Sequence, residues 1–451
     1  MAAVPLPATL RALKHRDFQL FVGGQVISLI GTWMQTVAQA WLVYRLTGSS
    51  LLLGTVGFTG QIPVFLLAPI GGIVADRCDR RRIVVATQIA SMVLAGALAW
   101  LTLAGSVRVW HVMVLSALLG AVNAFDIPAR QSFLVDMVGK DDLMNAIALN
   151  SSIFNSARVV GPGIAGLLVA ALGEGWCFLI NAVTYLAVIA GLLVMKVRRH
   201  RAPAEAGSPI DQIVQGFRFA WTTRPVRDIL LLVGLISAVG MPYTVLMPIF
   251  ADQILRGGAL GLGILMSATG LGALGGALFL ASRATVRGLG RFVAIAAVGF
   301  ALSMALFAFS PYFWLSAAAL VPTGGFMMLQ MAASNTLLQA MVPDHLRGRV
   351  MALYSMMFMG MAPLGAFFAG AAADRLGAPM TVGVGAVACL LGTAVFAARL
   401  PALRVEARAL IVAQGLSGGE PPQEMVGGGV ALPKPPAKGI MTARDFHGGS
   451  E

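Results

Sequence analysis

Polar side chains recur along one face of the first apolar stretch of the chain. Steps of three and four residues separate five of them, which places all five on one side of an α-helix: Gln25, Ser28, Thr32, Gln35 and Gln39. Amides and hydroxyls on a membrane helix cannot face lipid without losing their hydrogen bonds. The face therefore lines either a cavity, where these groups would contact a substrate, or an interface with another helix. We favour the cavity.

Asp126 is a carboxylate within a later apolar stretch, with Asn123 three residues before it. It could accept a proton or bind a cationic group of a substrate. The alternative is an ion pair with Arg130 at i, i+4, which would gate the mouth of a cavity. An internal repeat, described below, places Gln330 at the position equivalent to Asp126. We expect Asn123 and Gln330 to line the cavity as well.

Arg158 is the most informative single residue. It lies about 22 Å along a helix that starts near Leu143, at a rise of about 1.5 Å per residue. Arginine is rare at this depth and nearly always faces protein or water. Arg158 could attract an anionic substrate or shift the pKa of a nearby carboxylate. Alternatively, Asn155, backbone carbonyls or Asp126 hold it structurally. Asp126 and Arg158 are the candidates for coupling or charge relay.

The composition defines the elements that must position these residues. The 451 residues are 58% hydrophobic and 11% charged, with a mean hydropathy of +0.82, which indicates an all-α polytopic membrane protein. The net charge of +13 falls between apolar stretches, so it indicates topology rather than nucleic-acid binding. The His and Cys residues lack ligand spacing, and no Walker-type phosphate loop is present. We expect no enzyme activity, cofactor or metal site.

Twelve stretches are long and apolar enough to cross a bilayer as helices. They are 18 to 45, 51 to 75, 83 to 104, 109 to 129, 143 to 171, 176 to 195, 228 to 250, 259 to 281, 291 to 309, 312 to 340, 350 to 373 and 378 to 399. If the N-terminus is inside, the inner segments hold 27 of the 32 Lys and Arg residues and the outer connections hold four. This asymmetry predicts that both termini are cytoplasmic.

The chain divides into two pseudo-symmetric six-helix bundles. At an offset of 204 residues, 11 of the 37 positions from 137 to 173 are identical, against roughly three or four expected by chance. The predicted units are a cytoplasmic N-terminal segment (1 to 17), an N-terminal bundle (18 to 195), a cytoplasmic linker with a surface helix (196 to 227), a C-terminal bundle (228 to 400) and a disordered cytoplasmic tail (401 to 451).

Two motifs give the chain a family resemblance. The connection after the second stretch reads Gly-x-x-x-Asp-Arg-x-x-Arg-Arg from Gly72 to Arg81. The fifth stretch contains Gly161-Pro162 and Gly166, similar to the Gly-Pro-x-x-Gly-Gly motif of exporters. Together they resemble the major facilitator superfamily of secondary transporters. A proline kink at Gly161, Pro162 and Gly166 favours export, whereas a packing motif without directionality is the alternative.

Further motifs resemble the branch of the superfamily with bacterial siderophore (enterobactin-type) exporters and macrolide efflux pumps. They are Gly31-Thr32-Trp33-Met34, Leu46-Thr47-Gly48-Ser49, the two prolines Pro242 and Pro248 of the seventh stretch, and the segment from Val342 to Arg349. The resemblance implies export of an amphipathic siderophore or drug-like molecule from the cytoplasm by proton antiport with alternating access. An importer of a small metabolite, or a receptor or assembly partner that does not transport, is the alternative. Protein partners are not predicted.

The connection from Gly72 to Arg81 is also expected to act as a conformational latch. Gly72 would let the second helix pack closely. Asp76 would then face the start of the eleventh helix, near Arg347 and Arg349, where a helix N-terminus favours a carboxylate. This contact, with Arg77, Arg80 and Arg81 beside it, would close the inner mouth of the cavity.

Overall fold

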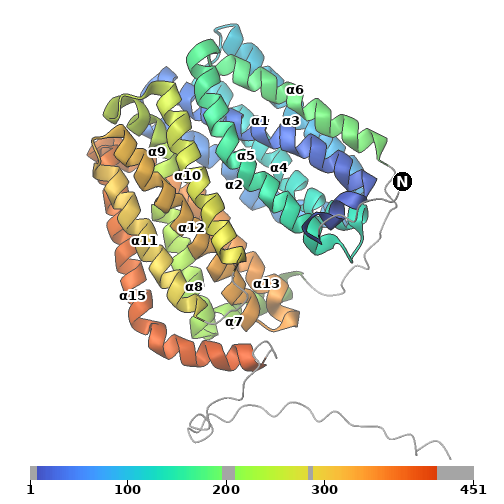
Figure 1. Ribbon diagram of the computed structural model, residues 1–451, viewed down its shortest axis with the longest axis vertical. Coiled ribbons are helices and arrows are strands. Elements are labelled where there is room, and N and C mark those ends of the chain that lie inside the picture. The colour runs from blue at the N-terminus through green and yellow to red at the C-terminus, as the bar shows by residue number, and fades with distance from the viewer. Residues whose placement is uncertain (1–7, 196–208, 283–287, 414–451) are drawn as a thin grey trace, which may run out of the picture.

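The computed structural model describes residues 8–195, 209–282 and 288–413, and every regular element in these ranges is helical (Figure 1). Twelve helices, two of them interrupted by π-turns, are long and apolar enough to cross a membrane. The twelve predicted stretches are therefore confirmed. The predicted all-α class is confirmed too.

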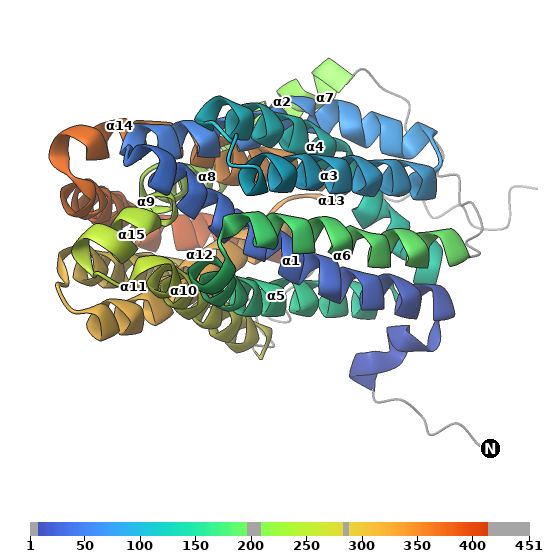
Figure 2. The same cartoon turned by 90° about the horizontal axis from the view of Figure 1, so that it is seen from above.

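The N-terminal half contains six spans in an up-and-down order. A 3₁₀ helix, η1 (Ala8–Lys14), precedes them; the spans are α1 (Arg16–Thr47), α2 (Ser50–Arg77), α3 (Arg80–Leu103), α4 (Val109–Val138), α5 (Leu143–Leu172) and α6 (Glu174–Val194). Figure 2 shows α1 and α6 between α5 on one side and α3 and α4 on the other, in agreement with their contacts. Within this half, α1 thus reaches both α4 and α5.

The C-terminal half follows the helix α7 (Pro209–Thr222). Its first span consists of α8 (Arg224–Leu235), η2 (Ile236–Gly240), α9 (Tyr243–Ile249) and η3 (Phe250–Ile254). The next three spans are the single helices α10 (Gly258–Ala281), α11 (Leu289–Phe309) and α12 (Phe313–Met341). The fifth span consists of α13 (Asp344–Ser355), η4 (Met356–Gly360) and α14 (Met361–Leu376), and the sixth is α15 (Ala378–Ala413). We expect both Pro242 and Pro248 to break this first span, because proline lacks the N–H that continues a helix. The span is interrupted by a turn at Met241 and Pro242, but Pro248 lies inside α9.

The C-terminal boundary differs from the prediction. We predicted a disordered tail from residue 401, but α15 continues through Pro401 to Ala413. Leu403 is buried, Arg399 donates a hydrogen bond to Asp228, and Glu406 forms an ion pair with Arg224. These contacts hold the extension against the start of α8. The rest of the predicted tail lies outside the described residues.

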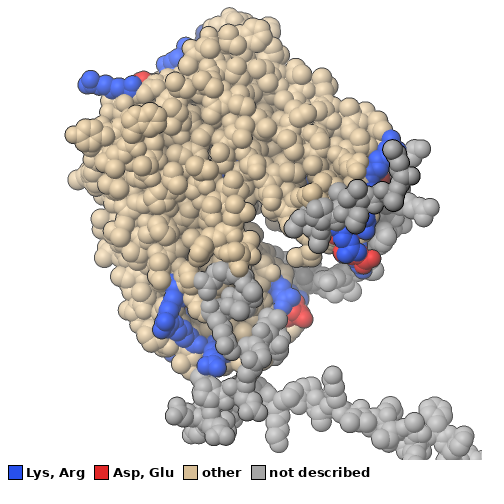
Figure 3. All heavy atoms as spheres, in the orientation of Figure 1, with Lys and Arg blue, Asp and Glu red and all other residues tan. Residues whose placement is uncertain are grey.

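The ends of the bundle can be named by their connections. The basic end carries the α2–α3, α4–α5 and α12–α13 connections, and the opposite end carries the α1–α2, α5–α6 and α14–α15 connections. Figure 3 shows Lys and Arg side chains on the lower, basic end of both halves, and a hollow between the halves on that side. The two ends are used below to place the cavity.

An ion-pair cluster joins η1 to the start of α5 at the basic end. The Asp142 carboxylate, whose side chain is 2% exposed, contacts Lys14 Nζ at 2.7 Å, His15 Nε2 at 2.8 Å and Arg11 Nε at 3.1 Å. Hydrogen bonds from Lys14 and then from His15 lower the pKa of Asp142 to about 2. The contribution of this carboxylate to stability is therefore complete above its ordinary pKa of about 3.9 and disappears as the pH falls through about 2.

We predict that Asp142→Asn releases η1 from the bundle, because Arg11, Lys14 and His15 lose their shared carboxylate. Trypsin should then cleave the detergent-purified protein after Arg11 and Lys14 several-fold faster than it cleaves wild type at pH 8. Asp141→Asn removes the same charge from the exposed neighbouring side chain and is the matched control. Equal cleavage rates for the two variants would show that Asp142 does not hold η1.

Candidate substrate-binding cavity

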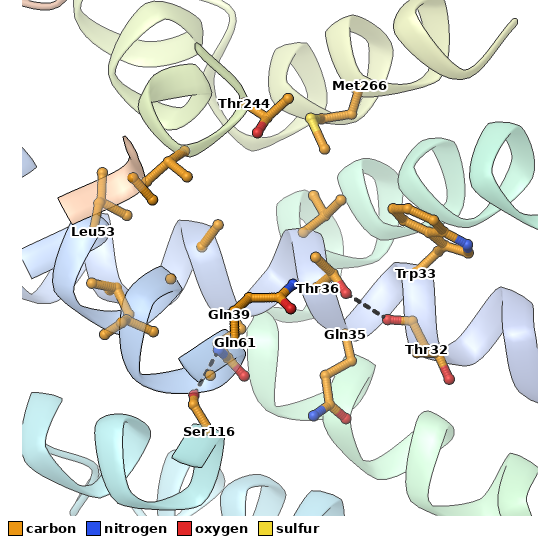
Figure 4. A pocket seen from close by; sticks show the side chains of 18 of the residues that line it. Thr32, Trp33, Gln35, Thr36, Gln39, Leu53, Gln61, Ser116, Thr244 and Met266 are labelled. Carbon is orange, nitrogen blue, oxygen red and sulfur yellow. Dashed lines mark hydrogen bonds between the residues drawn. The ribbon is translucent and has the colours of Figure 1, made fainter. Parts of the chain in front are cut away.

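A cavity of about 450 Å³ lies between the two halves. Figure 4 shows its wall, with Thr32, Gln35 and Gln39 on α1 and with Thr244 and Met266 on the facing helices of the C-terminal half. Helices α1, α2, α4, α5 and α6 line one side, and α9, α10 and α14 contribute most of the other. The wall mixes amides and hydroxyls with apolar side chains. It can therefore hold a molecule with both polar and apolar parts.

Small residues close the cavity at the opposite end, where α2 packs on α14. A Cβ on Gly370 would lie 3.1 Å from the Gly54 Cα, so the two backbones are in contact. Two polar contacts join the halves at the same end. Tyr44 donates to Asp252 at 2.7 Å, and the Leu51 amide donates to Asp374 at 3.2 Å. The cavity is therefore shut from this side.

The seam between α5 and α10 is built in the same way. A Cβ on Gly166 would lie 2.9 Å from the Gly263 Cα, and a Cβ on Gly263 would lie 2.6 Å from the Pro162 carbonyl oxygen. Gly166 and Gly370 are equivalent in the sequence repeat, and both make the contact between halves. Gly161 packs within its own half, where a Cβ would lie 2.6 Å from Trp33 Cβ. The predicted exporter motif is thus a close-packing motif here, within a helix that remains continuous through Pro162.

The polar face of α1 lies partly in the cavity wall and partly in an interface with other helices, the two environments that the sequence allowed. Thr32, Gln35 and Gln39 line the cavity. Asn181 of α6 donates to Gln35 Oε1 at 2.6 Å, and Gln39 donates to Ser116 of α4 at 2.9 Å. These bonds hold both amides in the wall.

Gln25 and Ser28 do not line the cavity, contrary to the prediction. Both are buried nearer the basic end, and Gln25 Oε1 accepts a hydrogen bond from Arg130 of α4 at 3.2 Å. The α-helical period places them on the same face as Gln35. The neighbouring helices cover that face along this part of α1, so the pair serves as interface.

Asn123 lines the cavity as predicted, but Gln330 does not. The Gln330 side chain has no exposed surface and donates to Ser334 one turn along α12. Both α10 and α11 pack on α12 and bury this position. The repeat therefore predicted the helix correctly but not the environment of this side chain.

Asp126 lies behind the cavity wall at the interface of α3 and α4. Its carboxylate is buried and accepts from Thr87 Oγ1 at 2.8 Å and from Gln88 Nε2 at 3.0 Å. Arg130 Nε lies 3.3 Å from the other carboxylate oxygen, so the i, i+4 ion pair is present. Since Arg130 also donates to Gln25, a chain of polar contacts runs from Asp126 to α1.

Arg158 lines the cavity, and none of the three predicted structural partners neutralises it. Asn155 donates to the Ser151 carbonyl, and Asp126 is engaged by Arg130. The Arg158 guanidinium instead lies over the Trp33 ring, 5.6 Å from its centroid. Arg158 is the only charged residue among the described residues of the cavity wall.

The latch residues are not brought together in this structure. Asp76 is exposed, Arg347 pairs with Asp344 on its own helix, and Arg349 donates to Gln215 of α7. The α2 and α14 seam ends near Gly360, which packs on Phe65, so the segments diverge toward the basic end.

The arginines after Asp76 bind within the N-terminal half instead. Arg80 donates to the Ser132 carbonyl and to Asp136 of α4, and Arg81 donates to the Leu192 and Leu193 carbonyls of α6. Arg77 is exposed at the tip. These contacts fix the connection to α4 and α6.

Gly72 does not provide the predicted close packing. A Cβ on Gly72 would meet nothing within 4 Å, whereas a Cβ on Gly71 would lie 2.0 Å from the Ala124 carbonyl oxygen of α4. The motif predicted that Gly72 makes the close helix contact. The adjacent Gly71 makes this contact instead, because Gly71 faces α4.

We predict that Gly71→Ala lowers the thermal stability of the detergent-purified protein, because the added methyl forces α2 away from α4. Overpacking of this kind typically costs about 1–3 kcal/mol. Gly72→Ala is the matched control and should be neutral or slightly stabilising, since alanine favours helix over glycine. Scanning fluorimetry compares the two variants. Equal melting shifts would contradict the assignment of the contact to Gly71.

Several wall residues were missed from the sequence. They are Gln61, Ser116, Asn181, Tyr185, Thr244 and Thr269. Each is a polar residue in a stretch that is otherwise apolar. That signal alone could have identified them, because such groups need partners away from lipid. They lack the repeated spacing that marked α1.

The comparisons with known proteins agree with this architecture. The family described as "Transmembrane secretion effector" matches residues 8–417. The chain belongs to this family of the major facilitator superfamily, whose members are multi-pass membrane transporters rather than enzymes. The predicted family resemblance is confirmed.

Particular relatives are exporters and transporters of small molecules. The chain is 30% identical to the multidrug efflux pump Tap of Mycolicibacterium fortuitum, over 83% of this chain and 93% of that protein. It is 25% identical to the staphyloferrin A transporter of Staphylococcus aureus (83% and 94%) and 26% identical to the enterobactin exporter EntS of Shigella boydii (87% and 93%). The nucleoside transporter NupG shares the fold at a TM-score of 0.68 and 14% identity, covering 85% of this chain and 99% of that one.

Proposed function

We propose that the protein exports an amphipathic small molecule, siderophore or drug-like, from the cytoplasm across a bacterial inner membrane in exchange for protons. The observation that carries this proposal is the cavity between the halves, whose wall combines amides with apolar side chains. Its relatives support the direction, since two of them are named as an efflux pump and an exporter. The alternatives from the sequence, an importer or a receptor that does not transport, remain outcomes of the test.

The orientation of the chain follows from its charge distribution. The basic end carries the connections that are rich in Lys and Arg, and such connections stay in the cytoplasm. With both termini cytoplasmic, the seams at the opposite end close the cavity from outside. The structure then represents the inward-facing state of a transporter that works by alternating access.

Transport requires the two halves to rock about the bound molecule. Moving to the outward-facing state separates α2 from α14 and breaks the contacts of Asp252 and Asp374 with the N-terminal half. Both seams consist largely of small residues, which form few directional bonds. The change from the inward-facing to the outward-facing state therefore breaks few hydrogen bonds. On the inner side, the same motion would bring Asp76 to the start of α13, where the latch forms.

Asp126 is the proposed proton-coupling residue. Protonation would weaken its ion pair with Arg130, and Arg130 also holds Gln25 on α1. Because α1 carries Thr32, Gln35 and Gln39 into the cavity, a change at Asp126 would be transmitted to substrate-binding residues. Coupling is thereby assigned to the N-terminal half alone.

We predict that Asp126→Asn abolishes gradient-driven efflux at unchanged protein abundance. Everted vesicles energised by respiration should accumulate a fluorescent drug-like probe with wild type, and an ionophore should abolish the accumulation. Asp141→Asn, an exposed carboxylate at the basic end, is the control and should transport normally. Normal efflux by Asp126→Asn would remove Asp126 from the mechanism. Probe binding without accumulation by wild type would favour a receptor.

We predict that Asp76→Asn shifts the protein toward the inward-facing state, since the latch stabilises only the state in which the basic end is closed. A cysteine at Gln61 in the cavity, in a background in which Cys78 is replaced and the remaining Cys177 and Cys389 are buried, reports access from the cytoplasm. Its labelling by a membrane-impermeant maleimide in everted vesicles should rise several-fold in the variant. Equal labelling of the variant and its parent would refute the latch.

A further inference from the structure

Arg158 is a cation in the cavity wall that forms no ion pair with a described residue. It lies near the middle of the 30-residue helix α5, about 22 Å from either end at about 1.5 Å per residue. Among the described residues, the structure gives it no ion pair, and no carboxylate contributes to the cavity wall. Arg158 is half-buried, and a cation without a counter-charge at membrane depth usually has a functional partner.

The aromatic contact orients the guanidinium without neutralising it. Arg158 lies over the Trp33 ring, and Trp33 packs edge-on against Phe154, with ring centroids 5.7 Å apart. A cation over an aromatic face contributes about 0.5–2 kcal/mol, which is less than a desolvated charge needs. The fork of N–H donors on arginine is suited to a carboxylate or another oxyanion, which it binds with two parallel hydrogen bonds.

The backbone of Arg158 belongs to the seam between the two halves. Pro162 leaves the Arg158 carbonyl without its usual i+4 donor, and this carbonyl packs on Gly270 of α10, where a Cβ would lie 2.7 Å away. The next carbonyl, of Val159, accepts from Ser267 Oγ at 2.8 Å. A ligand bound at Arg158 would therefore sit where α5 meets α10, the place that changes when the halves move.

We propose that Arg158 is an anion-recognition site and that the transported molecule carries a carboxylate or similar oxyanion joined to an apolar body. This inference rests on the proposed function and specifies its substrate class. The oxyanion is bound by Arg158, and the apolar body packs on other residues of the same wall such as Leu53, Val245 and Met266. Cations are disfavoured by the unpaired guanidinium.

Three probes that share one fluorophore test the proposal. Each joins a dansyl group to a short alkyl chain that ends in a carboxylate, a carboxamide or an amine. Binding to the full-length protein in detergent is followed by fluorescence anisotropy. We expect wild type to bind the carboxylate probe at least 10-fold more tightly than the amide, since hydrogen bonds to charged groups exceed neutral ones. The amine should bind most weakly.

Two variants and a control localise the effect. Arg158→Gln should abolish the preference for the carboxylate, and Arg158→Lys should keep part of it, because the charge remains but the fork is lost. Arg375→Gln removes an exposed arginine from the last turn of α14 and should bind like wild type. If Arg158→Gln does not fold, the order of the affinities of wild type for the three probes still tests the proposal.

The inference is overturned if wild type fails to bind the carboxylate probe, binds all three equally or binds the amine most tightly. It is also overturned if Arg158→Gln folds and keeps the preference. Because these measurements need no gradient, they are separate from the efflux test. Selective carboxylate binding without transport contradicts the proposed function alone, whereas transport of a drug-like probe without selective binding contradicts only the role of Arg158.

Discussion

Polar groups inside a bilayer must find their partners within the protein, and this requirement shapes every buried polar contact of the structure. Asp126 satisfies it with Thr87, Gln88 and Arg130. Gln35 satisfies it with Asn181. Each solution ties two or more spans together, so the polar residues of the N-terminal half also assemble it. Arg158, without a counter-charge, lies over the Trp33 ring and lines the cavity.

Much of the fold could be predicted from the sequence because the bilayer leaves few options. Uninterrupted apolar stretches of about 20 residues have to be helices, and all twelve are present. The repeat predicted two similar halves, and its glycines prove to have matching roles. Gly166 and Gly370 each contact the other half, and Gly161 and Gly365 each pack within their own. Helix ends were less predictable. The extension of α15 depends on contacts of Arg399 and Glu406 with distant residues, which no local pattern encodes.

The candidate site was only partly predictable, for a geometric reason. Helical periodicity gives the direction of a side chain about its own axis, but not which neighbour lies there. It therefore grouped Gln25 with Gln35, although only Gln35 contributes to the cavity wall. For the same reason the close contact was predicted at Gly72 and is made by Gly71, two positions that differ by about 100° around a helix. Residues such as Gln61 are isolated polar positions on other helices. They come together in the cavity wall only in the tertiary structure.

The contact of η1 with Asp142 has a consequence for how the chain assembles. The carboxylate lies 127 or more residues after the three cations that it binds. Four spans are synthesised between them, so η1 cannot dock until α4 has returned the chain to the basic end. A misplaced or inverted span among these four would put the carboxylate on the wrong side of the membrane. Docking of η1 thus reports that the first four spans have been inserted with the correct topology.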